Sequence, residues 1–154
     1  MSHGNHLFDL VKKLQSQDSG GREDAAEELG QLFERVSLGE IELEQQDYES
    51  IVKEVLKLAL NETDPEVKEA LFFSLVSAAN MVMGETINWD QLAAAVEGIE
   101  DANLLECAVT VLGFARKKEY GPIIRNYINH PDPDVSQAAK EALIELEGKK
   151  DKEA

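Results

Sequence analysis

Residues 132–143 read DPDVSQAAKEAL, and residues 64–75 read DPEVKEALFFSL. Over their first eight positions the two stretches are identical at four, which hold Asp, Pro, Val and Ala. The Asp side chain can accept a hydrogen bond from a free amide of the first helical turn, and Pro suits the first helical position because it has no amide proton. Each stretch therefore predicts the start of a helix, one at Pro65 and one at Pro133.

A third stretch, from Asp101 to Ala108, keeps the Asp, an apolar fourth residue and small seventh and eighth residues. The three Asp residues are separated by 37 and 31 positions, and a period near 34 with two helices in each unit is typical of an α-solenoid. Small side chains recur at the seventh position of each stretch, and they allow a neighbouring helix to approach closely. These three are Ala70, Cys107 and Ala138.

Apolar residues recur at helical spacing through most of the remaining chain, and residues that end helices separate the segments. The pattern predicts an all-α fold with eight helices and no strand. The expected spans are 7–14, 22–36, 47–60, a helix beginning at 65, 88–98 with a capping box from Asn88 to Gln91, 102–116, a short helix with Pro122 in its first turn that ends before His130, and 133–148. We expect Ser19–Arg22 to be a linker, residues 1–148 to form one domain, and the charged tail 149–154 to fray.

The pattern Asp-Pro-x-Val-x-x-Ala-Ala-x-x-Ala-Leu, intact from Asp132 to Leu143 and nearly so from Asp64 to Leu75, resembles the second helix of HEAT repeats, an armadillo-like helical repeat family. The resemblance implies a right-handed α-solenoid of about four helix pairs, in which the second helix of each pair lines a shallow concave face. The basic residue that usually follows the Val is present only as Lys68, so we expect packing to hold the other turns.

Composition excludes several functional classes. The 154 residues carry 31 acidic and 15 basic side chains, a formal charge of −16, which opposes direct nucleic-acid binding because nucleic acid carries one negative charge per phosphate. A single cysteine, Cys107, excludes an internal disulfide framework and a cysteine zinc site. The longest uncharged stretch, 70–84, is shorter than the ~20 residues of a membrane-spanning helix, and the first residues do not resemble a secretory signal, so we expect a cytoplasmic protein.

Catalytic constellations are not evident either. The three histidines are His3, His6 and His130, and no held histidine pair is available to bind a metal or activate a nucleophile. His130 and Asp132 are better explained as a helix end and a helix cap. We therefore expect no enzymatic activity, no cofactor and no metal.

Acidity is concentrated in the first half of the chain, where residues 23–54 hold eleven carboxylates against Arg35 and Lys53. Such a field speeds encounter with a basic partner, although acidity also serves solubility alone. Residues 40–44, EIELE, alternate acidic and apolar side chains, and they form either a partner-binding segment or a loop pinned by its two apolar residues. Tyr48 and Trp89 are either core residues or interface anchors, and Phe73 and Phe114 flank the core stripes. The candidate partner-binding residues are Glu40, Ile41, Glu42, Leu43, Glu44, Asp47, Tyr48, Glu49, Phe73, Trp89 and Phe114.

The expected function is therefore protein binding, with a basic protein as the partner. In size and charge the chain also resembles the small acidic immunity proteins of bacterial toxin systems, and that resemblance implies binding and neutralisation of a cognate, often basic, nuclease toxin. Two alternatives stay open: an assembly adaptor or subunit similar to the HEAT-repeat lyases that attach bilin pigments, and a scaffold with several partners. The sequence gives no prediction of the oligomeric state.

Overall fold

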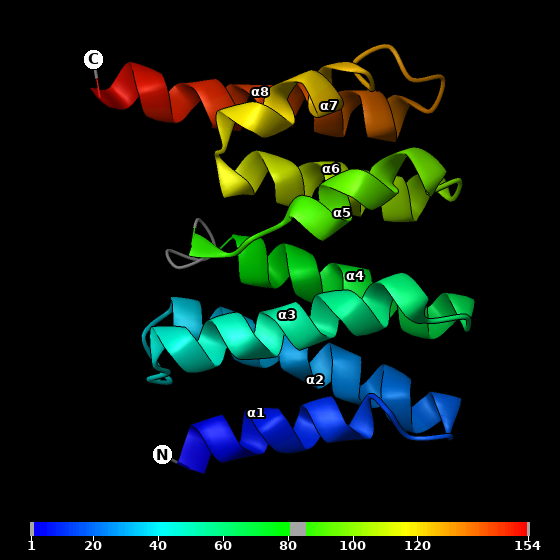
Figure 1. Cartoon of the computed structure of the whole chain (residues 1–154), viewed down its shortest axis with the longest axis vertical. Coiled ribbons are helices and arrows are strands. Elements are labelled where there is room, and N and C mark those ends of the chain that lie inside the picture. Colours follow the sequence, from blue (N-terminus) through cyan, green and yellow to red (C-terminus); the bar gives the residue numbers. More distant parts are fainter. Residues whose placement is uncertain (1, 81–85, 154) are drawn as a thin grey trace. The chain divides into compact units, whose positions relative to one another are not determined.

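The computed structural model describes residues 2–80 and 86–153, and it describes side chains for 6–80 and 86–147 (Figure 1). Within these ranges the secondary structure is helical and contains no strand, which confirms the all-α prediction. The α-helices are α1 Ser2–Lys13, α2 Ser19–Ser37, α3 Gln45–Asn61, α4 Pro65–Ala79, α5 Asp90–Ala95, α6 Ala102–Ala115, α7 Gly121–Arg125 and α8 Pro133–Glu153, with 3₁₀ turns at Val96–Gly98 and Lys118–Tyr120. None of the described helices is both long and apolar enough to cross a membrane.

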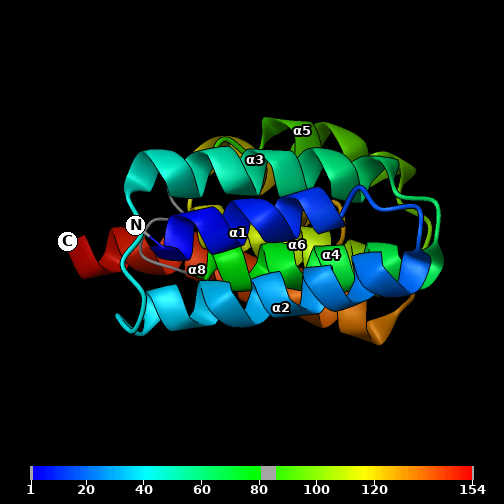
Figure 2. The ribbon, with the colours of Figure 1, turned by 90° about the horizontal axis from the view of Figure 1, so that it is seen from below.

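The chain divides into two compact units, unit 1 from Met1 to Met83 and unit 2 from Gly84 to Ala154. In unit 1, α1 packs on α2 and α3 packs on α4, and the second helices of these pairs, α2 and α4, lie side by side (Figures 1 and 2). In unit 2, α5 contacts α6, α7 contacts α8, and the second helices α6 and α8 are again neighbours. Each unit therefore consists of two stacked helix pairs, as the helical-repeat prediction requires, while the prediction of one domain over 1–148 stays a prediction.

Three aspartates cap the second helices as the sequence predicts. Oδ1 of Asp64 accepts hydrogen bonds from the second and third amides of α4, at 3.0 and 3.2 Å. Asp101 does the same for α6 at 2.8 and 3.2 Å, and Asp132 for α8 at 2.9 and 3.3 Å. These bonds satisfy amides that have no partner within the helix, so the caps fix where each second helix begins.

The start of α2 differs from the prediction. Asp18 is its N-cap and accepts a hydrogen bond from the Gly21 amide at 3.3 Å, so Ser19–Arg22 form the first helical turn and the linker prediction for them is wrong. A side-chain cap upstream overrides the low helix propensity of two consecutive glycines.

Other helix boundaries also differ: the first helix begins at Ser2 and not near Leu7, and the third begins at Gln45 and not at Asp47. The helix expected at Asn88 begins at Asp90, with Trp89 as its N-cap; the Asn88 side-chain oxygen still accepts from the Asp90 amide at 2.8 Å, but Asn88 itself lies outside the helix. The last helix, expected to end near Gly148, continues to Glu153.

Candidate functional site

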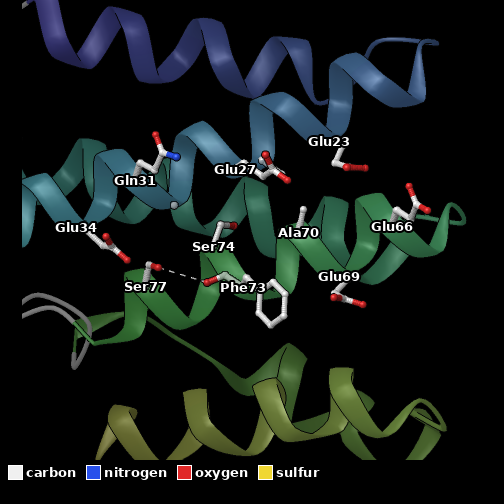
Figure 3. Close-up of a pocket in the computed structure, with 12 residues that line it drawn as sticks. Glu23, Glu27, Gln31, Glu34, Glu66, Glu69, Ala70, Phe73, Ser74 and Ser77 are labelled. Carbon is white, nitrogen blue, oxygen red and sulfur yellow. Dashed lines mark hydrogen bonds between the residues drawn. The ribbon is translucent and has the colours of Figure 1, made fainter.

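A groove of about 440 Å³ lies between α2 and α4 in unit 1 (Figure 3). We call it the acidic groove. Its residues are Glu23, Ala26, Glu27, Gly30, Gln31 and Glu34 from α2, and Glu66, Glu69, Ala70, Phe73, Ser74 and Ser77 from α4.

Small residues form the floor of the acidic groove. A Cβ atom on Gly30 would lie 3.5 Å from the Ser74 Cα, so the two helices approach closely at this point. Ser74 is buried, and its hydroxyl donates to the Leu71 carbonyl at 2.7 Å. Because the floor side chains are short and the rim side chains are long, the surface between the helices is concave.

The rims of the acidic groove carry five carboxylates: Glu23, Glu27 and Glu34 from α2, and Glu66 and Glu69 from α4 (Figure 3). Among the described residues that line the groove, none is basic.

Both arginines of unit 1 pair with carboxylates outside the groove. Arg22 Nε lies 2.9 Å from Glu62 Oε1, and Arg35 Nε lies 3.1 Å from Glu40 Oε2. None of the ion pairs described for unit 1 includes a carboxylate of the groove, so its negative charge is available to a partner.

Carboxylates are most crowded where Glu23 faces the start of α4. Partial burial, the charges of Glu66, Glu27 and Asp24, and a side-chain hydrogen bond with Glu66 raise the pKa of Glu23 above its ordinary value. Each of these charges disfavours a further negative charge nearby. A bound cation would relieve this repulsion.

Phe73 supplies an apolar surface on the α4 rim. Its side chain is 52% exposed, although its neighbour Phe72 is fully buried in the core. A half-exposed phenylalanine in a concave, charged surface is the kind of residue that anchors protein interfaces. The acidic groove thus combines an apolar contact with unpaired negative charge.

The predicted acidic segment 40–49 does not line this groove. Ile41 is buried, Leu43 is half-buried, and the Glu40 carboxylate is paired with Arg35, so the interpretation of 40–44 as a pinned loop fits the structure. Glu42 and Glu44 are exposed, whereas Asp47 and Glu49 are half-exposed at the start of α3. As a partner-binding surface this segment keeps carboxylates but loses its buried anchor, Ile41.

Tyr48 and Trp89 are core residues, so their selection as partner-binding anchors is wrong for this structure. Both have 0% exposure. The Tyr48 hydroxyl donates to the Ala78 carbonyl, and its ring meets Phe33 edge to face with centroids 5.9 Å apart. Burial raises the pKa of the Tyr48 hydroxyl. Each residue lies near the beginning of a helix and faces the interior, and an interior position satisfies the large apolar surface of both rings.

Phe114 lines a second and smaller groove of about 190 Å³ in unit 2, between α6 and α8. We call it the unit 2 groove. Its residues are Thr110, Gly113, Phe114, Ala138, Glu141, Ala142 and Glu145. Phe73 and Phe114 are therefore the two predicted aromatics that each line a groove between second helices.

The sequence prediction of site residues does not include the α2 carboxylates of the acidic groove, although they belong to the acidic stretch 23–54. Glu23, Glu27 and Glu34 recur on one side of α2 at helical spacing, and Gly30 interrupts them. A glycine within this polar stripe leaves room for a second helix to approach, and this signal would have pointed to the groove.

The described part of the chain offers no cluster of side chains for binding a metal ion. No group of three or more His, Cys, Asp or Glu side chains among those residues is arranged to hold a metal ion.

Comparisons with known proteins inform the fold alone. No family model matches the chain, and no curated protein is significantly similar to it. A crystal structure of an engineered protein is similar with a TM-score of 0.69 at 19% sequence identity, covering 92% of this chain. The chain spans 62% of the length of that engineered protein.

Proposed function

We propose that this chain is a non-catalytic protein-binding module of the HEAT-like class, and that its acidic groove binds a basic segment of a partner protein. The observation that carries the proposal is the half-exposed Phe73 beside five carboxylates that no lining residue neutralises. The Asp caps and the stacked helix pairs support the family assignment.

Charge distribution favours a cationic partner. Unit 1 contains 17 acidic and 7 basic side chains, and its two arginines are already paired outside the groove. A concave surface lined by one sign of charge attracts the opposite sign and raises the association rate, which falls again when salt screens the field. The acidic groove is thus suited to rapid, salt-sensitive binding.

As its biological role, we propose that the chain is an immunity protein that binds a basic, nuclease-type toxin in the cytoplasm. Carboxylates of the acidic groove would contact the cationic surface with which a nuclease binds phosphates, and would exclude the nucleic acid substrate. The net charge of −16 and the small size support this form.

A binding experiment separates the groove from bulk acidity. The probe is a fluorescein-labelled decapeptide with arginines on both sides of a leucine, measured by fluorescence anisotropy in ~50 mM salt. Glu23→Gln/Glu66→Gln removes two charges from the groove, and Glu42→Gln/Glu44→Gln removes two exposed charges from the 38–44 loop as a matched control.

We expect the groove variant to bind the peptide at least ~10-fold more weakly, because two close charge contacts contribute more than ~1.4 kcal/mol together. Phe73→Ala should weaken binding ~5-fold or more, as truncation of an interface aromatic costs 1 kcal/mol or more. The loop variant should stay within about twofold of the wild type. Equal losses in the groove and loop variants would mean that affinity follows net charge alone, and the proposal would then be wrong.

The immunity form has its own test. Cells that express a nuclease toxin encoded beside this chain should survive with the wild type and the loop variant, and should die with the groove variant. Survival with the groove variant would remove the acidic groove from that role.

A further inference from the structure

The two units repeat the packing of their second helices in the same register. Gly30 of α2 meets Ser74 of α4, and Gly113 of α6 meets Ala142 of α8. We align the two units on these contacts. Each residue of α2 then corresponds to the α6 residue 83 positions later, and each residue of α4 corresponds to the α8 residue 68 positions later.

The same register brings carboxylates together in unit 2. The counterparts of Glu23 and Glu66 are Glu106 and Asp134. Burial, together with the charges of Asp134, Asp132 and Glu141, raises the pKa of Glu106. Carboxylates are therefore crowded in unit 2 as well, at Glu106 and Asp134, which lie next to the unit 2 groove through Glu141 and do not themselves line it.

The unit 2 groove has its own division of charge. At one end Glu145 is paired with Arg116, whose Nε lies 3.0 Å from Glu145 Oε1. Toward the other end, Asp132 caps α8, and Glu141 accepts a hydrogen bond from the Gln137 side-chain amide at 3.1 Å. The ion pairs described for unit 2 do not include Glu106 or Asp134. Arg116 therefore neutralises the Glu145 end of the groove, whereas Glu141 in the lining and the neighbouring Glu106 and Asp134 keep their negative charge.

An apolar wall accompanies that charge. Phe114, the counterpart of Gln31, is partly exposed and lines the groove two turns beyond Glu106 on α6. Among the described lining residues of this groove, as in unit 1, none is basic. Both grooves thus combine carboxylates with one aromatic ring, which comes from α4 in unit 1 and from α6 in unit 2.

The volume limits the occupant. At about 190 Å³ the unit 2 groove is smaller than the ~300–1,000 Å³ typical of small-molecule pockets, and less than half the size of the acidic groove. It has room for one or two side chains. A cation near Glu106 and an apolar group against Phe114 complement its charge and its lining.

We propose that the unit 2 groove is a second and weaker docking site for a basic protein segment, so that one chain binds two such segments. The chemistry of the ligand rests on the proposed function of the acidic groove, whereas the existence of the second site rests on the repeated register, the carboxylates at Glu106 and the groove beside Phe114.

Isothermal titration with the same arginine–leucine decapeptide tests this. The wild type should bind two peptides, with the second site ~10-fold weaker than the first. Glu106→Gln/Asp134→Asn should leave one site with affinity within twofold of the tight site, and Glu23→Gln/Glu66→Gln should abolish the tight phase of the titration, because it weakens the first site at least ~10-fold and leaves the second site unchanged. A matched control, Glu97→Gln/Glu100→Gln, removes two exposed charges elsewhere in unit 2 and should keep both sites.

Backbone amide shifts supply a second measurement. During titration of the Glu23→Gln/Glu66→Gln variant with peptide, the amides of Thr110 and Phe114 should shift, and they should stop shifting when Glu106→Gln/Asp134→Asn is added. One site in the wild type, or two sites retained in Glu106→Gln/Asp134→Asn, would overturn the second site and leave the proposed function standing. The absence of any binding would overturn both. A purely structural role for Asp134 at the start of α8 would change the unfolding free energy and leave the number of sites unchanged.

Discussion

Gly30 and Gly113 lie where the second helices of each unit touch, and replacing each of them by alanine should have opposite effects in the two units. At Gly113 an added Cβ would lie 2.6 Å from the Ala142 Cβ and 2.7 Å from the Ala142 Cα, about 1 Å inside the usual carbon–carbon contact distance. The obstructing atoms belong to the backbone of α8 and its first side-chain carbon, so they cannot rotate away. At Gly30 the nearest atoms are the Ser74 Cα and Cβ, at 3.5 and 3.6 Å, which is ordinary contact.

The expected free energies follow from these distances. Gly113→Ala forces α6 and α8 apart, and overpacking of this kind costs about 1–3 kcal/mol, reduced by up to ~1 kcal/mol because alanine favours the helix. A net loss of about 1–2 kcal/mol should result. Gly30→Ala keeps the helix gain without a clash and should stabilise unit 1 by about 0.5–1 kcal/mol.

Urea unfolding followed by two signals tests the pair. Trp89, the single tryptophan, is buried in unit 2, so its fluorescence reports on that unit, while circular dichroism reports on helices of both units. With m near 2 kcal/mol/M, Gly113→Ala should lower the fluorescence midpoint by about 0.5–1 M, and Gly30→Ala should raise the dichroism midpoint by about 0.25–0.5 M. Gly113→Ala as stable as the wild type, or Gly30→Ala as destabilised as Gly113→Ala, would refute the inference that α6 and α8 touch more closely than α2 and α4.

Two further predictions concern polar groups in unit 1. Glu62→Gln should destabilise unit 1 by about 2 kcal/mol in urea titrations at pH 7, because Glu62 accepts from Arg22 and from the Thr63 and Asp64 amides. Desolvation raises the pKa of Glu62, but these hydrogen bonds outweigh it and hold the pKa below its ordinary value. The stabilisation by Glu62 is therefore complete above the ordinary pKa and is lost as the pH falls through the lower folded-state pKa. Glu62→Gln should therefore unfold with a shallower dependence on acid, and an unchanged acid limb would contradict this. Tyr48→Phe should cost about 1 kcal/mol at pH 8, because it removes the hydrogen bond to the Ala78 carbonyl. Since the pKa of Tyr48 is raised in the folded state, wild-type stability is full below the unfolded-state pKa of about 10 and falls as the pH rises above it. Tyr48→Phe should lose less stability than the wild type between pH 8 and 10.5. Equal losses would refute this prediction.

Much of the secondary structure could be predicted because its signals are local. An Asp cap followed by Pro or Ala and then by apolar residues at helical spacing satisfies the first amides of a helix wherever the helix packs, and the caps at Asp64, Asp101 and Asp132 are as expected. The errors arose where local signals competed. The glycines after Asp18 indicated a linker but lie in a capped first turn, and Asn88 indicated a cap but bonds just outside the helix.

The candidate site was only partly predictable. Phe73 and Phe114 were selected and each lines a groove, but Tyr48 and Trp89 proved to be core residues, and the groove carboxylates of α2 were not selected. The local sequence does not show whether an aromatic side chain near the start of a helix faces the core or the solvent. Which side is covered depends on the neighbouring helix, and that neighbour is remote in sequence.

The sequence by itself determined the helices, their Asp caps and their repetition in pairs, because these depend on spacing and hydrogen bonding within a few residues. The tertiary structure alone decided which side chains share a surface. Phe72 and Phe73 are adjacent in sequence, yet one is 1% and the other 52% exposed, since successive helical residues point about 100° apart and packing of α4 against its neighbours covers one direction and leaves the other open. Glu23 and Glu66 meet for the same reason: close contact at Gly30 and Ser74 sets α2 and α4 side by side, and residues that are far apart in the chain become the rims of one groove.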